Sequence, residues 1–133
     1  MQRNIKEIME SSLNRLLQKA KADTDVLAVI LFGSAARNES DSLSDVDVCI
    51  LLNKNYAPLV MSHKRLEYLS VSDFDVSIFQ QLPLYIKHRV AKEGKVLFCR
   101  DEERLYELVF KTIKEFEDFK PIYHEYLKSI VHA

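Results

Sequence analysis

VILFGSAAR (residues 29–37) and SDVDVCILL (residues 44–52) are two apolar runs joined by a polar connection. The first run ends in a Gly-Ser turn, and the second opens with two aspartates that flank one valine. Because side chains on a strand alternate between faces, Asp45 and Asp47 are expected to point the same way. Two adjacent carboxylates repel each other unless a cation lies between them, and such hard oxygen ligands suit Mg²⁺. The segment therefore predicts two strands that carry a magnesium site.

Two further features extend this predicted site. The turn offers the backbone N–H groups of Gly33 and Ser34, together with the Ser34 hydroxyl, where a phosphate could lie. Residues 71–79, VSDFDVSIF, alternate polar and apolar and predict a half-buried strand with Asp73 and Asp75 on its polar face. If this strand pairs beside the Asp45/Asp47 strand, three carboxylates converge. Three acids that hold two Mg²⁺ ions on a nucleoside triphosphate are the apparatus of two-metal phosphoryl or nucleotidyl transfer.

Composition limits the class of protein. The chain of 133 residues is 47% hydrophobic, which suits one domain (residues 1–133) with a real core. Its net charge of −1 argues against a generic nucleic-acid binder. With no signal peptide and no apolar run of about 18 residues, we expect a cytoplasmic protein that does not insert in a membrane. Cys49 and Cys99 lie in apolar runs and are expected to be free, buried thiols.

The periodicity of the chain predicts an α+β (α/β-like) domain. Its small mixed β-sheet should carry helices mainly on one face and the acids on the exposed face. The sequence predicts a first helix to about residue 21, and strands over 26–32, 45–52, 71–79 and 95–99. Further helices are expected from Pro58 to about residue 68 and from Pro83 to about residue 92, where Gly94 ends the helix. A long helix capped by Asp101 should break or kink at Pro121, before a short last helix over 122–131.

These motifs resemble those of a known superfamily. The order Gly33-Ser34, ten residues, then Asp45-Val46-Asp47 is similar to the signature of the minimal nucleotidyltransferases of the DNA polymerase β superfamily. The run GKVLFCRD (94–101) resembles that family's strand after its third aspartate. The tail FEDFKPIYHEYL (116–127) resembles the C-terminal extension of MntA-type antitoxins, so that residues 101–133 form a helical extension. The resemblance implies a nucleotidyltransferase fold.

The resemblance also implies roles for individual residues. Asp45, Asp47 and Asp75 would be catalytic and bind Mg²⁺, and Asp75 would take the proton from the attacking hydroxyl. Asp75 is preferred to Asp73 because the family's third acid lies between apolar strand residues. Gly33, Ser34 and Arg37 would hold the phosphates of ATP. Ala35 stands where the family commonly has another arginine.

Two groups of side chains remain open to two interpretations each. The first group is basic and is either a solvated helix face or a contact for a partner or a triphosphate: Lys87, His88, Arg89, Lys92, Lys95 and Arg100. The second is aromatic and either closes the core or docks a partner, since aromatic residues are enriched at interfaces: Phe110, Phe116, Phe119, Tyr123 and Tyr126.

The predicted function is a Mg²⁺-dependent nucleotidyltransferase that transfers AMP from ATP to a hydroxyl group. Resemblance to MntA-type antitoxins implies that the acceptor is a tyrosine of a partner HEPN-type toxin, which the modification silences within a hetero-oligomer. One alternative is transfer to a small-molecule hydroxyl, such as that of an aminoglycoside. The other is an antitoxin that acts by binding alone.

Overall fold

The computed structural model describes residues 5–33 and 46–131. Its elements follow one another along the chain as α1 (Ile5–Ala22), β1 (Val26–Phe32), β2 (Asp47–Leu52), α2 (Pro58–Leu69), β3 (Asp75–Ile78), the short 3₁₀ helix η3 (Phe79–Gln81), α3 (Leu84–Glu93), β4 (Lys95–Cys99) and α4 (Glu102–Val131). None of the described helices is long and apolar enough to cross a membrane.

The four strands form one mixed sheet in the order β3-β2-β1-β4. Strand β1 is antiparallel to both β2 and β4, whereas β2 and β3 are parallel. A parallel pair needs a crossover connection, and α2 provides it. The predicted small mixed sheet is confirmed, but its third strand is shorter than the expected 71–79 and begins only at Asp75.

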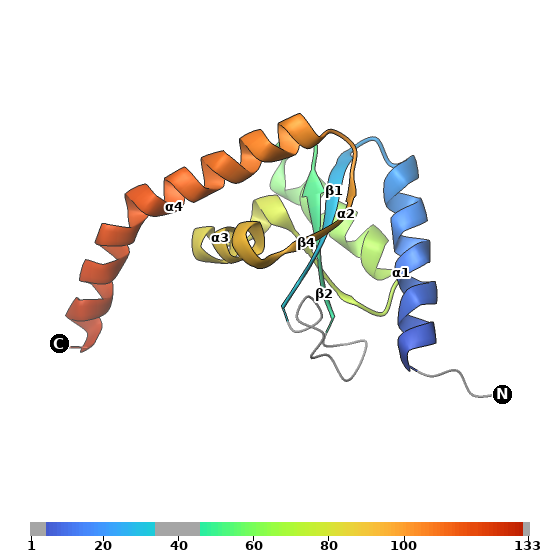
Figure 1. Ribbon diagram of the computed structural model, residues 1–133, viewed down its shortest axis with the longest axis horizontal. Helices are drawn as coiled ribbons and strands as arrows, with labels where there is room; N and C mark the ends of the chain where they lie inside the picture. The colour runs from blue at the N-terminus through green and yellow to red at the C-terminus, as the bar shows by residue number, and fades with distance from the viewer. Residues whose placement is uncertain (1–4, 34–45, 132–133) are drawn as a thin grey trace.

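The helices are divided between the two faces of the sheet rather than packed mainly on one (Figure 1). Helices α1 and α2 cover one face through buried residues such as Leu16 and Tyr68. Helix α3 and the first turns of α4 cover the other, through Val90 and Leu105. The reason lies in β1 and β2, which are almost entirely buried. Strands that are apolar on both sides need cover on both sides.

Helix α4 runs through Pro121 without interruption, so of the predicted break or kink the break is wrong, and so is the separate last helix. A proline inside a helix removes one backbone hydrogen bond, which bends a helix but does not always end it. The ribbon of α4 bends in its second half and projects beyond α3 (Figure 1). Only the first part of α4 belongs to the core, because Leu105 and Thr112 are its buried residues. The predicted cap is present, since the Arg104 N–H donates to Asp101 Oδ1 at 3.2 Å.

A polar network ties α2 to the turn between α1 and β1. Lys64 Nζ donates to Asp23 Oδ2 at 3.0 Å and to Asp25 Oδ2 at 3.1 Å. The hydroxyl of Tyr68, which is fully buried, donates to Asp23 Oδ2 at 3.0 Å, and that of Tyr56 donates to Asp25 Oδ1 at 2.8 Å. These bonds lower the pKa of Asp25, with the Tyr56 hydrogen bond as the first cause and Lys64 as the next. The network fixes the end of the sheet opposite the acids.

Candidate active site

Asp47 and Asp75 lie side by side at the start of two parallel strands. They are direct partners in the register of β2 and β3, and the Asp75 N–H donates to the Val46 carbonyl at 3.0 Å. Val46, Val48 and Val76 face the core beneath α1 and α2. By alternation, both aspartates point to the other face of the sheet, where Asp47 lines a cavity with residues of α3. Neighbouring strands are about 4.8 Å apart, so the two carboxylates can share one cation.

Gly33 closes this site from the end of β1. Its φ of 75° is in the left-handed region, where a side chain is strained. A Cβ atom at this position would collide with Asp47 Oδ2. Glycine therefore lets the backbone at residue 33 lie directly against the carboxylate, which is the close approach that a phosphate held beside Asp47 requires.

Helix α3 brings a cation to the same place. Gly33 and Asp47 line a cavity of about 130 Å³ together with Ile86, Arg89 and Glu93. The Arg89 guanidinium lies 3.8 Å from Glu93 Oε2, and both side chains are more than half exposed. This is a weak, solvated ion pair, which leaves Arg89 with donors for another anion. Ile86 and Glu93 were not among the predicted site residues. Their spacing of three and four residues from Arg89 places all three on one helical face, and this spacing could have indicated that they line the same cavity.

The basic side chains that the sequence analysis grouped together lie in different parts of the structure. Arg100 is structural, because its guanidinium donates to the carbonyls of residues 20, 21, 23 and 26 at the end of α1 and the start of β1. His88 stacks on Phe116 with ring centroids 3.9 Å apart, and burial lowers its pKa. Lys87 lines a different cavity. Arg89 alone of these four lines the cavity beside Asp47.

Asp45, Ser34 and Arg37 lie outside the described residues, as do Ser44 and Ala35. Within residues 5–33 and 46–131, no three His, Cys, Asp or Glu side chains are grouped to hold a metal ion. Asp73 is exposed and precedes β3, whereas Asp75 is in register with Asp47. The two described carboxylates supply the hard oxygen donors that Mg²⁺ prefers, so the donor set fits this ion.

The two cysteines are free, as predicted, but only Cys49 is buried, whereas Cys99 is partly exposed. Cys49 is fully buried next to the acids along β2, and burial raises the pKa of its thiol to about 12. It is therefore a neutral core residue and not a nucleophile.

A small mixed sheet with paired aspartates behind a strand–glycine turn defines the nucleotidyltransferase class. The profile of the polymerase beta nucleotidyltransferase family matches residues 14–103, and the chain belongs to this family. A protein of Methanocaldococcus jannaschii named putative protein adenylyltransferase is 34% identical over an alignment of 101 residues, and the match covers 71% of this chain and 73% of that protein.

Solved structures with the same fold come from toxin–antitoxin complexes. A chain of a toxin–antitoxin complex with AMP-PNP superposes with a TM-score of 0.69 at 19% identity, covering 92% of this chain and 98% of that one. A chain from a complex of the tri-AMPylated Shewanella oneidensis HEPN toxin with its MNT antitoxin superposes with a TM-score of 0.67 at 16% identity. That match covers 94% of this chain and 98% of the other. At these identities the likeness establishes the fold.

Proposed function

We propose that this protein is a cytoplasmic antitoxin that transfers AMP from ATP to a tyrosine hydroxyl of a HEPN-type toxin. The observation that carries the proposal is the pairing of Asp47 with Asp75 behind the Gly33 turn. Support for the reaction comes from the family and from the name of the 34% identical relative. Support for the partner comes from the complexes that contain chains of the same fold.

The described acids would hold Mg²⁺, with Asp45 as the third predicted ligand. When bound, the metal lowers the charge repulsion between the triphosphate and the attacking oxygen. Asp75 would accept the proton of the tyrosine hydroxyl, whose oxygen forms the new bond to the α-phosphorus. The bond to the β-phosphate oxygen breaks, and pyrophosphate leaves with that electron pair. The Gly33 turn keeps the phosphates against Asp47, which supplies the positioning part of the catalysis.

Arg89 would contact the phosphates from the side of α3. Its guanidinium is a fork of donors that matches phosphate oxygens, and its only salt bridge among the described residues is the exposed one to Glu93. Ser34 and Arg37 are the other predicted phosphate contacts.

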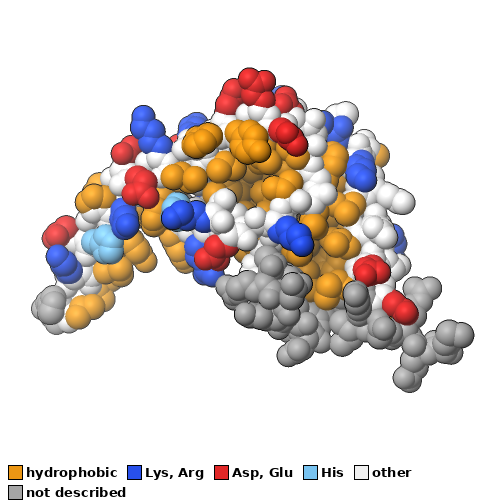
Figure 2. All heavy atoms as spheres, in the orientation of Figure 1, with side chains coloured by type: hydrophobic (Ala, Val, Ile, Leu, Met, Phe, Trp, Pro, Cys, Tyr) orange, Lys and Arg blue, Asp and Glu red, His pale blue; other side chains and the backbone are white. Residues whose placement is uncertain are grey.

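The second half of α4 would dock the toxin. Its apolar side chains recur at helical spacing on an exposed surface, with Ile122 at 65%, Tyr126 at 61% and Ile130 at 54% exposure. Figure 2 shows hydrophobic side chains along the lower side of this projecting arm. From residue 117 to 131 no residue is buried, so this half contributes little to the core. A stripe of this kind fits an apolar helix of a partner.

The direct test is to incubate the purified pair with ATP and Mg²⁺ and to measure the intact mass of the toxin. We expect a gain of one or more AMP groups on a tyrosine, and no gain with Asp75→Asn. Neutralisation of the toxin by the Asp75→Asn variant, with no change in mass, would show that contact alone is sufficient. AMP on a small-molecule hydroxyl and none on the toxin would assign the enzyme to the antibiotic-modifying type.

Truncation after Lys120 separates docking from folding. The shortened protein should keep its circular dichroism per residue and its Mg²⁺-ATP affinity, because the core lies N-terminal to the cut. Its affinity for the toxin should fall. An unfolded product would make the segment part of the core, and unchanged capture of the toxin would place the interface elsewhere.

A further inference from the structure

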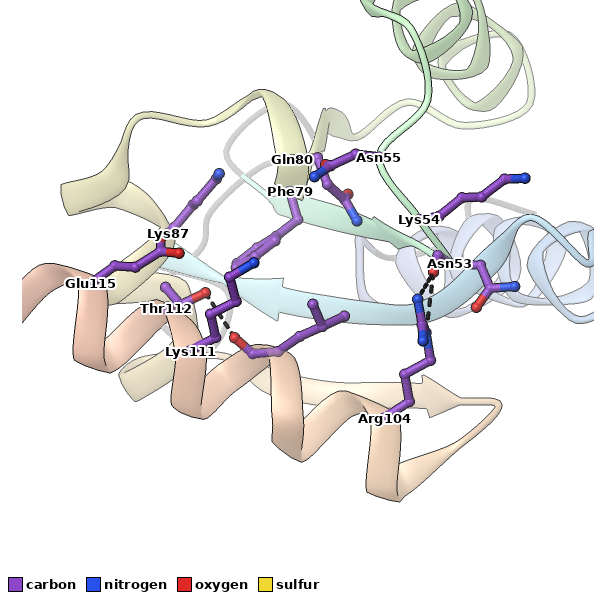
Figure 3. Close-up of a pocket in the computed structure, with 11 residues that line it drawn as sticks. Asn53, Lys54, Asn55, Phe79, Gln80, Lys87, Arg104, Lys111, Thr112 and Glu115 are labelled. Atoms are coloured by element: carbon purple, nitrogen blue, oxygen red, sulfur yellow. Dashed lines mark hydrogen bonds between the residues drawn. The ribbon is translucent and has the colours of Figure 1, made fainter.

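A second cavity lies on the same face of the sheet as the acids but at the other end of β2. It occupies about 380 Å³ and is bounded by the segment after β2, by η3 and by helices α3 and α4 (Figure 3). Asn53 lines it, and this residue follows the last residue of β2, whereas Asp47 is the first. At about 3.3 Å per strand residue, Asn53 and Asp47 are roughly 20 Å apart along β2. The proposed reaction makes no use of this cavity.

Its walls carry four cations from three parts of the chain. Lys54 comes from the segment after β2, Lys87 from α3, and Arg104 and Lys111 from α4. Glu115 is the one carboxylate among the lining residues. None of the four cations forms a salt bridge to a described residue. The whole chain has a net charge of −1, so the positive charge is concentrated locally at this cavity. Such a local concentration of positive charge attracts anions to the cavity.

Of the four cations, Arg104 is fixed by hydrogen bonds to the wall of the cavity. Arg104 Nε donates to the Asn53 carbonyl at 3.1 Å, and Nη2 donates to the same oxygen, which leaves Nη1 with no partner among the described residues. Lys87 Nζ lies 5.8 Å from the centre of the Phe79 ring. Figure 3 shows Lys111 extending from α4 toward Phe79 while Arg104 reaches Asn53. Lys87 and Lys111 thus approach the buried Phe79 ring, whereas Lys54 extends away from it, with its Nζ 5.1 Å from the centre of the Tyr56 ring (Figure 3).

We propose that this basic cavity is a second, metal-independent site for a compact polyanion with two or more linked phosphates. Its volume falls within the range of small-ligand sites, roughly 300–1,000 Å³, and its concave shape favours a small molecule over a flat macromolecular surface. Lysine and arginine donors recognise phosphate oxygens directly. The active site instead presents carboxylates and needs Mg²⁺ to hold a triphosphate. Chelation of Mg²⁺ should therefore abolish triphosphate binding at the active site and leave binding at the basic cavity intact.

The test is calorimetric titration of the full chain in excess EDTA with three probes: inorganic triphosphate, ATP and adenosine. We expect triphosphate and ATP to bind and adenosine not to bind. ATP affinity equal to that of triphosphate means that the phosphate chain is the ligand. ATP affinity about tenfold higher means that the cavity also recognises the nucleoside, and the nucleotide is the ligand. Absence of triphosphate binding in EDTA overturns the proposal.

Matched variants locate the binding. Lys87→Ala with Lys111→Ala should weaken triphosphate binding about tenfold or more, since charged hydrogen bonds are lost. The control is Lys92→Ala with Lys114→Ala, which removes the same charges from the same two helices outside the cavity. Equal weakening by the control pair would show diffuse charge attraction and refute the site. Asp47→Asn should leave binding in EDTA unchanged, whereas loss of binding in that variant would assign the anion to the active site.

Discussion

Gly33→Ala tests whether the turn after β1 positions the Asp47 carboxylate. Alanine at a φ of 75° costs about 1–2 kcal/mol, because its Cβ crowds the backbone in the left-handed region. The same Cβ collides with Asp47 Oδ2, so the carboxylate must move or change rotamer. This collision adds about 1 kcal/mol to the cost of the backbone strain, so we expect the free energy of unfolding to fall by roughly 2–3 kcal/mol. Urea denaturation followed by circular dichroism measures this loss.

The effect on catalysis should exceed the effect on folding. A displacement of about 1 Å at a reacting centre can cost 10²-fold in rate. We therefore expect AMP transfer per folded molecule to fall about a hundredfold, measured by the mass gain of the toxin at saturating ATP and Mg²⁺. If the transfer rate falls while the affinity of the variant for the toxin is unchanged, loss of docking is excluded as the cause of the slower transfer.

Gly94→Ala is the matched control. Gly94 has an ordinary φ of −68°, and a Cβ atom there would collide with the Val90 carbonyl and the Ile30 side chain, away from the acids. This variant should lose stability through overpacking, by about 1–3 kcal/mol, and keep its transfer rate per folded molecule. If Gly33→Ala retained transfer within about threefold of the unaltered protein, Asp47 would not need this turn, and the assignment of Gly33 would fail.

Three further predictions concern other residues. Asp75→Asn should reduce transfer far more than Asp73→Asn when both are timed at saturating Mg²⁺, and the reverse order would show that Asp73 is the third acid. Arg89→Ala should raise the KM for ATP about tenfold with little change in kcat, because it removes a charged hydrogen bond to bound phosphate; an equal effect from Lys92→Ala would indicate general charge attraction. Burial, followed by the Asp23 carboxylate, raises the pKa of Tyr68 above its ordinary value of 10.0. The stability tied to its protonation is therefore full below pH 10 and falls as the pH rises further. Tyr68→Phe should flatten this alkaline decline in urea denaturation, and an unchanged slope would contradict the assignment.

Local patterns predicted the elements that form the site. The strand over 26–32, the strand over 95–99 and the helix that starts at Pro58 have the expected bounds because periodicity and end signals are local. The alternation over 71–79 identified Asp75, and its pairing with Asp47 is the arrangement that the predicted acid cluster requires. The roles of Asp45, Ser34 and Arg37 remain predictions.

Long-range features were not predictable in this way. Lys87 and Arg89 are two residues apart in the sequence but line different cavities, since two residues turn a helix by about 200°. Which cavity each side chain meets depends on how α3 packs on the sheet. The network around Lys64 joins three separate segments, and no short pattern encodes it. Helix α4 continues past Pro121 because the local cost of one proline does not decide the state of a long helix.

The parallel pairing of β2 and β3 has a consequence for the stage of synthesis at which the active site forms. Antiparallel β1 and β2 are neighbours in the chain, but Asp75 can reach Asp47 only after α2 has crossed the sheet and β3 has docked. Such non-local pairing forms late and slowly compared with local contacts. A chain still emerging from the ribosome, with β1 and β2 already paired, would therefore carry Asp47 without its counterpart. On the proposed function, protection from the toxin would begin with the completed fold and not with the first part of the chain to be made.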